Sequence, residues 1–141
     1  MIHSKNKIIG VFMKLSYTLI STGILLFSTY TFADFSDEYI TCVKSAGNRT
    51  EQMKECQLDE FKIQNKLAKK YYKKLLSAVE SPQQEFLKND QQKWLTQRNR
   101  MCKMKDEKIK NLSAIHMSCA VHITASRAEA LEVQLRNKNL L

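Results

Sequence analysis

Two stretches of the sequence decide the fold: residues 91–102, QQKWLTQRNRMC, and residues 119–131, CAVHITASRAEAL. The first contains four residues spaced by three or four positions, which places them on one face of an α-helix: Gln91, Trp94, Arg98 and Cys102. Burying glutamine or arginine beside tryptophan costs free energy unless the hydrogen bonds of the polar group are satisfied. The pattern therefore predicts a helix whose inner face needs a polar partner surface.

The second stretch offers such a surface, because it also has helical spacing and carries Thr124 and Arg127. We interpret the set as a buried polar network in which Arg98 and Gln91 satisfy helix-end carbonyls and Thr124 around the ring of Trp94. None of these side chains is a natural nucleophile or general base. We therefore expect a structural role for the network, with a binding site as the competing interpretation.

A third element of the pattern lies upstream, where Leu67, Tyr71 and Leu75 recur every four residues. Together with the two stretches above, this spacing resembles the LprI-like lysozyme-inhibitor family of small secreted bacterial domains, over roughly residues 39–132. The resemblance implies an exported helical domain that binds and blocks a lysozyme. The resemblance also implies that, in a bacterial periplasm, this inhibition would protect peptidoglycan from host or competitor muramidases.

The chain departs from the family pattern at three places. Asn99 stands where the family usually has an aspartate after the arginine, and Ala68 stands where it usually has an asparagine. The glycine pair common in the loop before the last cysteine is replaced by a charged segment. The first two changes predict an altered internal network, and the third falls in a loop that could contact a partner.

The first 33 residues are typical of a secretory signal peptide. A basic start at Met13-Lys14 precedes a short apolar region at 19–27 and a small-x-small cleavage signal at 31–33. The residues before Met13 are either a longer basic region or precede the true start. We expect a mature LprI-like domain at residues 34–141, periplasmic or secreted, with no lipid anchor because no cysteine follows the cleavage site.

The mature chain is basic. The full sequence has 23 basic and 14 acidic residues, and removal of Lys5, Lys7 and Lys14 leaves 20 basic residues and a net charge of +6. Its 108 residues suffice for one domain with a modest core. Two strongly basic proteins do not attract one another, so this charge favours an acidic muramidase, or an acidic cleft, as the target.

All four cysteines lie in the mature part: Cys42, Cys56, Cys102 and Cys119. An even number in a small exported domain predicts two disulfides, for which three pairings exist. We expect two helical hairpins, and each has one cysteine before its turn and one at a similar distance after it. This placement favours Cys42–Cys56 and Cys102–Cys119, each closing a loop worth on the order of 3 kcal/mol in the chain-entropy model.

The fold class we predict is all-α: a small disulfide-stapled helical bundle with one short and three longer helices. The mature part has one glycine, Gly47, and one proline, Pro82, and no alternating strand pattern. We expect helices near 37–45, 50–79, 81–104 and 113–136. Thr50 and Ser81 are the expected N-caps of the second and third helices, with Pro82 at the first helical position and Gln84 completing a capping box.

The expected inward positions of the second helix are Leu67, Tyr71, Leu75 and Val79. Its outward positions are lysines: Lys66, Lys69, Lys70, Lys73 and Lys74. The expected apolar side of the last helix is Cys119, Ile123, Ala130 and Leu131. Asp59 and Glu60 have the character of solvated helix carboxylates.

The segment between Cys102 and Cys119 is the best candidate for a partner-binding loop. Its basic residues are Lys103, Lys105, Lys108 and Lys110. A disulfide at its base lowers the entropy lost when the loop is ordered on a partner. A basic tip could enter a glycosidase cleft and pair with catalytic carboxylates, whereas the alternative is a plain solvated connector. The turn at 47–49 is the second choice.

Other chemistry has little support in the sequence. His116, Cys119 and His122 recur every three residues, but the two histidines diverge by about 120° on a helix and the cysteine is expected to be oxidised. We therefore predict no metal, no cofactor and no enzymatic activity. The function predicted is a lysozyme-inhibitor-like protein that blocks a muramidase by occlusion. The alternative is a cell-envelope adaptor that holds anionic polymer through its cationic helix face; nucleic acid is not expected as a partner.

Overall fold

The computed structural model of the protein describes residues 35–104 and 109–141, which form helices and contain no strand. Their bounds are α1 Asp37–Ala46, α2 Thr50–Ser77, α3 Ser81–Met101, the short 3₁₀ helix η1 Ile109–Asn111 and α4 Ala114–Asn137. The prediction of an all-α domain with one short and three long helices is therefore confirmed. The expected signal peptide at 1–33, with its alternative start at Met13, lies outside the described residues, as do Lys105 and Lys108.

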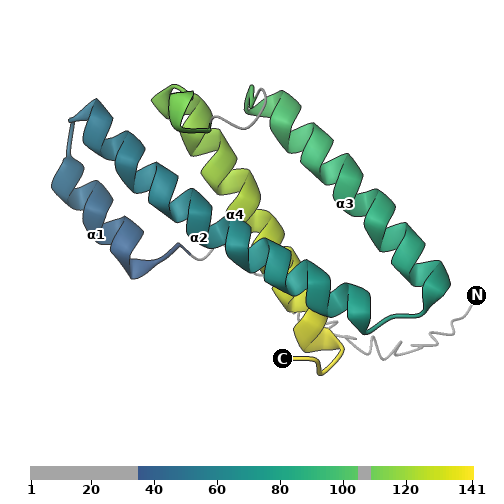
Figure 1. The fold of residues 1–141 in the computed structure, drawn as a ribbon. Helices are drawn as coiled ribbons and strands as arrows, with labels where there is room; N and C mark the ends of the chain where they lie inside the picture. The colour runs from purple at the N-terminus through teal and green to yellow at the C-terminus, as the bar shows by residue number, and fades with distance from the viewer. Residues whose placement is uncertain (1–34, 105–108) are drawn as a thin grey trace, which may run out of the picture.

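The helices α2 and α4 form the centre of the molecule and make its most extensive contact (Figure 1). Small buried residues, Ala68 on α2 and Ala120 and Ala128 on α4, leave room for this contact. α1 packs against α2, while the backbone of α3 comes close to α4 and α2 at only a few positions. No helix of the described part is long and apolar enough to cross a membrane.

The apolar core consists of two clusters along the α2–α4 contact. At the level of the second disulfide, Cys102 and Val121 pack with Phe61 and Ala120. At the other end, Leu75 of α2 packs with Leu131 and Leu135 of α4. α3 contributes to this second cluster only through the partly buried Leu87. The position of α3 therefore depends on contacts of another kind.

Both N-cap predictions were wrong by one residue. Thr50 and Ser81 are the first residues of their helices, and the residues before them, Arg49 and Glu80, occupy the cap position without a side-chain hydrogen bond to the helix. Arg49 instead donates through Nε to the Ala46 carbonyl oxygen at 3.1 Å, at the end of α1. Its guanidinium thus satisfies the preceding helix, which a capping rule based on short polar side chains does not anticipate.

The buried face of α2 is more polar than predicted. Leu75 is buried as expected, whereas Leu67, Tyr71 and Val79 are only partly buried. The positions that are buried instead are Gln57, Glu60, Phe61, Gln64 and Ala68. The five lysines of α2 that were predicted to face outward are exposed: Lys66, Lys69, Lys70, Lys73 and Lys74.

The expected apolar side of α4 was partly wrong. Ala130 is exposed, and Cys119 and Ile123 are only partly buried, whereas Leu131 is fully buried as expected. The buried face is instead rich in small residues that follow Met117. The difference is a rotation of the helix by about one residue, because α4 turns its small side chains toward α2.

Glu60 carries the polar contact that orients α1. It is 1% exposed, so the prediction of a solvated carboxylate was wrong. Its Oε1 accepts hydrogen bonds from the Ser36 backbone N–H at 3.1 Å and from Gln64 Nε2 at 2.7 Å, and its Oε2 accepts from the Ser36 hydroxyl. Ser36 is the N-cap of α1, and its Oγ accepts from the Tyr39 N–H at 3.1 Å. A buried carboxylate thus fixes the start of the short helix.

Both disulfides have the predicted pairing. Cys42–Cys56 joins α1 to α2 with a Cα–Cα distance of 5.7 Å, and Cys102–Cys119 joins the end of α3 to α4 at 5.4 Å. The first lies one helical turn from Glu60 along α2. α1 is therefore attached by a covalent link near its C-terminal half and by the carboxylate at its N-terminus.

Replacement of Glu60 by alanine removes the acceptor of the Ser36 N–H and hydroxyl, and we expect it to lower the free energy of unfolding by about 2 kcal/mol. Glu55→Ala is the matched control, because Glu55 is an exposed carboxylate on the same helix. Its effect should stay within about 0.5 kcal/mol. Urea denaturation followed by circular dichroism measures both; equal effects for the two variants would show that Glu60 does not hold α1.

Candidate functional site

The predicted polar network comes together between α3 and α4. Trp94 of α3 lies beside two guanidinium groups, with its ring centroid 4.8 Å from Cζ of Arg98 and 5.4 Å from Cζ of Arg127. Arg98 also lies over the ring of Phe61 on α2, at 5.5 Å. Cation–π contacts of this kind are worth about 0.5–2 kcal/mol each, more when the cation is removed from water. Through these contacts α3 reaches both central helices: Arg98 contacts Phe61 of α2, and Trp94 contacts Arg127 of α4.

Arg98 is buried without a carboxylate partner among the described residues. Its Nη1 donates to Thr124 Oγ1 at 3.4 Å, while its Nε and Nη2 donate to Asn99 Oδ1 at 3.3 and 3.2 Å. Burial lowers the pKa of Arg98 from its ordinary value. Arg98 lies in the last turn of α3, where the helix dipole favours a cation. Asn99 thus provides a hydrogen-bond acceptor for the guanidinium but no countercharge.

Arg127 reaches back from α4 to the middle of α3. Its Nη2 donates to Asp90 Oδ2 at 2.7 Å and to Gln91 Oε1 at 2.9 Å, and its Nε donates to the same Gln91 oxygen at 3.3 Å. Gln91 therefore binds a side chain rather than the helix-end carbonyls that we predicted. The sequence analysis missed Asp90, although an acidic residue next to Gln91 on the same helix was the available signal. Asp90 supplies the network's single negative charge among the described residues.

These contacts explain how α3 is held with so little apolar burial. Only Gln91 and Arg98 of α3 are classed as buried, and both are polar. Their hydrogen-bond partners come from α4 and from α3 itself. No group in the network has the arrangement of a nucleophile with a general base. The geometry is that of a structural tie between helices.

We expect Arg98→Lys to lower the free energy of unfolding by about 1–2 kcal/mol, because an ammonium group cannot reproduce the planar fork that contacts Thr124, Asn99 and the aromatic rings. Arg100→Lys is the matched control, since Arg100 is exposed two residues away on α3. Chemical denaturation of both variants provides the measurement. A change of less than about 0.5 kcal/mol for Arg98→Lys would contradict the proposed role of its guanidinium.

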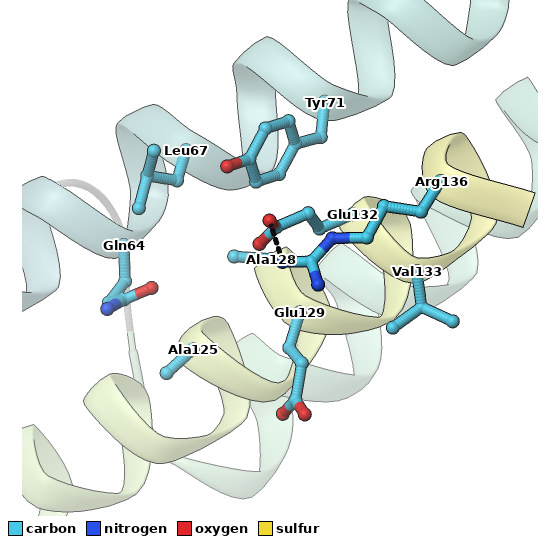
Figure 2. A pocket seen from close by; sticks show the side chains of 9 residues that line it. All are labelled: Gln64, Leu67, Tyr71, Ala125, Ala128, Glu129, Glu132, Val133 and Arg136. Atoms are coloured by element: carbon cyan, nitrogen blue, oxygen red, sulfur yellow. Dashed lines mark hydrogen bonds and ion pairs between the residues drawn. The ribbon is translucent and has the colours of Figure 1, made fainter. Parts of the chain in front are cut away.

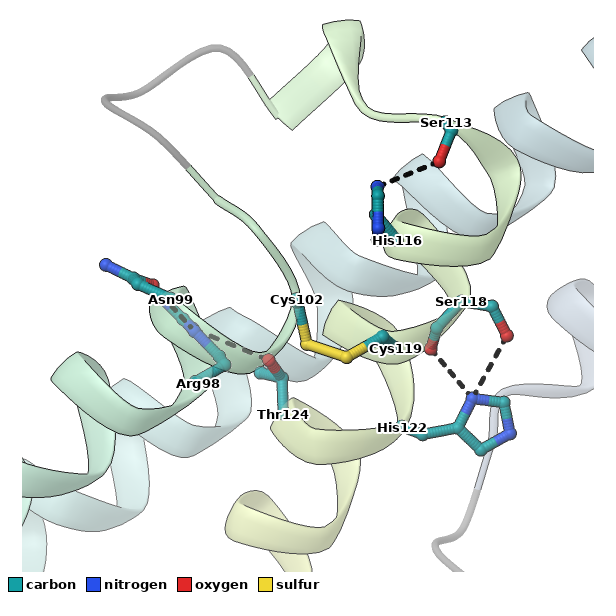
Figure 3. Close-up of a disulfide and its surroundings, with 9 residues drawn as sticks. All are labelled: Arg98, Asn99, Cys102, Ser113, His116, Ser118, Cys119, His122 and Thr124. Atoms are coloured by element: carbon teal, nitrogen blue, oxygen red, sulfur yellow. Dashed lines mark hydrogen bonds between the residues drawn. A yellow bond between two sulfur atoms is a disulfide. The ribbon is translucent and has the colours of Figure 1, made fainter.

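The second disulfide forms the base of the tip between α3 and α4 (Figure 3). Cys102 is fully buried, and Met104 and Ile109 pack partly buried against the same core cluster. After α3 ends, Lys103 adopts a left-handed conformation with φ of 50°, and the Met104 N–H donates to the Asn99 carbonyl at 2.9 Å. This helix ending directs the chain sharply away from α3 into the tip.

The tip carries both charge and apolar surface. Lys103 and Lys110 are exposed there, while Lys105 and Lys108 of the predicted set lie outside the described residues. Met101 at the end of α3 is 55% exposed, and Ile115 in the first turn of α4 is 74% exposed. Large exposed apolar side chains at the two ends of this connection make the tip a candidate protein-binding surface.

The two histidines of α4 do not converge on one point. His116 Nδ1 lies 2.9 Å from Ser113 Oγ, and His122 Nδ1 lies 2.8 Å from the Ser118 carbonyl oxygen (Figure 3). Cys119 between them is in the disulfide. The described residues hold no group of three or more histidine, cysteine or acidic side chains that could bind a metal.

A groove of about 410 Å³ lies between α2 and α4, with Tyr71 on one wall and Glu132 and Arg136 on the other (Figure 2). Arg136 is ion-paired with Glu132. Burial raises the pKa of Tyr71, and the neighbouring Glu132 carboxylate raises it further. The ion pair thus joins two of the three charged residues that line this groove, the third being Glu129, and no site was predicted there from the sequence.

A second groove, of about 680 Å³, runs along the exposed lysines of α2 and is bordered by η1. Its lining residues are Phe61, Lys62, Asn65, Lys66, Lys69, Lys70, Lys73 and Ile109. Four of the five lysines that the sequence analysis placed on the outer face of α2 line this groove, and Lys74 does not. The described structure therefore offers two cationic surfaces, the tip and the groove, with Ile109 of η1 between them.

The fold and the two disulfides define a small helical domain in which each peripheral helix is covalently linked to a central one. The chain belongs to the LprI lysozyme inhibitor family, whose model, described as "Lysozyme inhibitor LprI", matches residues 42–131. The match runs from the first cysteine to Leu131 of α4 and includes the whole polar network. No curated protein and no solved structure matches the chain significantly.

Proposed function

We propose that this protein is an exported lysozyme inhibitor that blocks a muramidase by occlusion. Membership of the LprI lysozyme inhibitor family is the observation that carries the proposal. Two disulfides support an oxidising compartment, as in a bacterial periplasm or outside the cell. The signal peptide predicted at 1–33 supplies the route of export. No catalytic group and no cofactor are part of the proposal.

The surface that we assign to the target is the tip between α3 and α4. Exposed Met101 and Ile115 provide apolar area, and Lys103 and Lys110 provide positive charge beside it. Glycosidases use a pair of carboxylates that flank the bond they cleave, so a lysine placed between them would neutralise the catalytic charges. The disulfide at the base of the tip limits the entropy that binding costs.

The positive charge of the mature chain bears on which muramidase is bound. With a net charge of +6 in the expected mature part, long-range attraction favours an enzyme with an acidic surface or an acidic cleft. For a strongly cationic lysozyme, association should be slower and should become faster as salt screens the repulsion. The salt dependence of the association rate therefore distinguishes the two kinds of target.

The test is a cell-wall lysis assay with several lysozyme types, comparing the protein with the variant Lys103→Glu/Lys110→Glu. We expect the concentration for half-inhibition to rise at least about tenfold, because reversing two charges replaces attraction to the acidic cleft with repulsion. The matched control is Lys44→Glu/Lys138→Glu, which changes the net charge equally at exposed positions away from the tip. Its half-inhibition concentration should change less than about threefold.

Two results would contradict the proposal at different levels. Failure to inhibit any lysozyme type at micromolar protein would overturn the inhibitor function itself. Inhibition that the tip and control variants weaken equally would overturn only the assignment of the tip. Thermal melts of both variants show whether they retain the fold.

A further inference from the structure

The lysine-lined groove on α2 meets the network at Phe61, which lies under Arg98, and meets the tip at Ile109, but its lysines belong to neither. Residues 61–79 contain six lysines and no acidic residue. Among the described residues, only Lys62 of the groove lysines is ion-paired, with Asp59 at 2.8 Å. Lys70 lies 5.8 Å from the ring centroid of Tyr71. The remaining three, Lys66, Lys69 and Lys73, lie exposed on one face without an acidic partner in this part of the chain.

This arrangement costs helix stability. Lys62 and Lys66, Lys66 and Lys70, and Lys69 and Lys73 are like-charge pairs four residues apart, and such pairs destabilise an exposed helix. An ordinary solvated helix alternates lysine with glutamate and so avoids this repulsion. A bound anion would remove it, because the anion neutralises several lysines at once.

The spacing of the lysines indicates the shape of the anion. From Lys62 to Lys73 the helix rises about 16 Å, at roughly 1.5 Å per residue. A single small anion cannot contact lysines over that length, whereas a chain with repeated charges can. Five lysines line the groove, and lysine ammonium groups bind phosphate as point charges that do not require one fixed geometry.

The groove also disfavours two other polyanionic partners. Its one aromatic lining residue, Phe61, is 7% exposed and lies under Arg98, so it offers no face on which a nucleic-acid base could stack. The lysines face a hollow bordered by Ile109 of η1, which a flexible chain can enter. A flat bilayer surface cannot follow that hollow.

We propose that this groove binds a linear phosphate-bearing polymer of the cell envelope. Binding would hold the protein at the envelope and leave Lys103 and Lys110 of the tip available, because neither of them lines the groove. The inference does not depend on the proposed inhibition of a muramidase, because polymer binding and inhibition use different lysines and are measured separately.

The experiment measures binding of the purified, disulfide-bonded protein to long-chain polyphosphate by titration calorimetry at several salt concentrations. With four or five lysines engaged, the logarithm of the affinity should fall against the logarithm of salt with a slope of about −3 to −4. Tripolyphosphate, which is too short to span the groove, should bind at least about tenfold more weakly, since it contacts fewer lysines. Vesicles of anionic phospholipid form the third arm.

The groove variant is Lys66→Gln/Lys69→Gln/Lys73→Gln, and its matched control is Lys44→Gln/Lys88→Gln/Lys138→Gln. Both lose three exposed positive charges, but the control positions lie outside the groove. We expect the groove variant to lose at least about tenfold in affinity and about two units of the salt slope, and the control to change less than about threefold.

Thermal melting keeps the result interpretable, because the groove variant removes repulsive pairs and should unfold no earlier than the unmodified protein. Retained melting temperature with lost polyphosphate binding supports the groove. An equal loss of polyphosphate affinity in both triple variants would show that binding depends on net charge alone and would overturn the proposal. Binding to vesicles but not to polyphosphate would overturn it in favour of a lipid surface. Tripolyphosphate that binds as tightly as the long chain would overturn the inference that the ligand is a polymer.

Discussion

The buried guanidinium of Arg98 is the constraint on which the position of α3 depends. A cation removed from water requires hydrogen-bond acceptors and favourable electrostatic contacts on most sides, and here Asn99, Thr124 and two aromatic rings provide them. These contacts are directional, so they fix the orientation of α3 as well as its distance from the core. An apolar stripe would allow the helix to slide or rotate more freely.

The same design recurs on the other side of the molecule. Each peripheral helix is attached to the α2–α4 pair by one disulfide and one buried charged side chain: Cys42–Cys56 with Glu60 for α1, and Cys102–Cys119 with Arg98 for α3. The disulfide limits the separation and the charged residue fixes the orientation. A small domain with two short apolar clusters can in this way hold four helices in place.

This attachment leaves the lysines of the tip and of α2 outside the contacts that hold the domain together. The tip between α3 and α4 projects from a rigid base, because the disulfide and the core cluster around Cys102 lie directly beneath it. The lysine face of α2 is likewise carried by a helix whose other faces are buried. Rigid supports of this kind reduce the entropy that binding costs, which suits the inhibition by occlusion that we propose.

The helices, the disulfide pairing and five members of the network could be predicted from the sequence, because each follows from local spacing: Gln91, Trp94, Arg98, Thr124 and Arg127. Trp94 and Arg98 share a helical face, and the cysteines flank two turns at matching distances. Glu60 and Asp90 could not be assigned in this way. A buried carboxylate and a solvated one look the same in a helical sequence, and the partners that distinguish them, Ser36 and Arg127, lie 24 and 37 residues away.

The cap residues and the faces of two helices were mispredicted for a related reason. A shift of one residue in a helix moves its buried face by about 100°, so the polar positions of α2 and the small residues of α4 became visible only in three dimensions. Ala130 is a small apolar residue of the kind found in cores, but small side chains at neighbouring positions make the closer contact with α2. Tertiary packing decided between faces that the sequence alone leaves nearly equivalent.

Native-state hydrogen exchange of Trp94→Ala tests the central claim most directly. Trp94 is the ring on which both guanidinium groups converge, so its loss should weaken the attachment of α3 more than the core. We expect amide protection to fall selectively in residues 81–101, while the middle of α2 and α4 keeps the protection of the unmodified protein. A loss of protection spread equally over α2, α3 and α4 would contradict it.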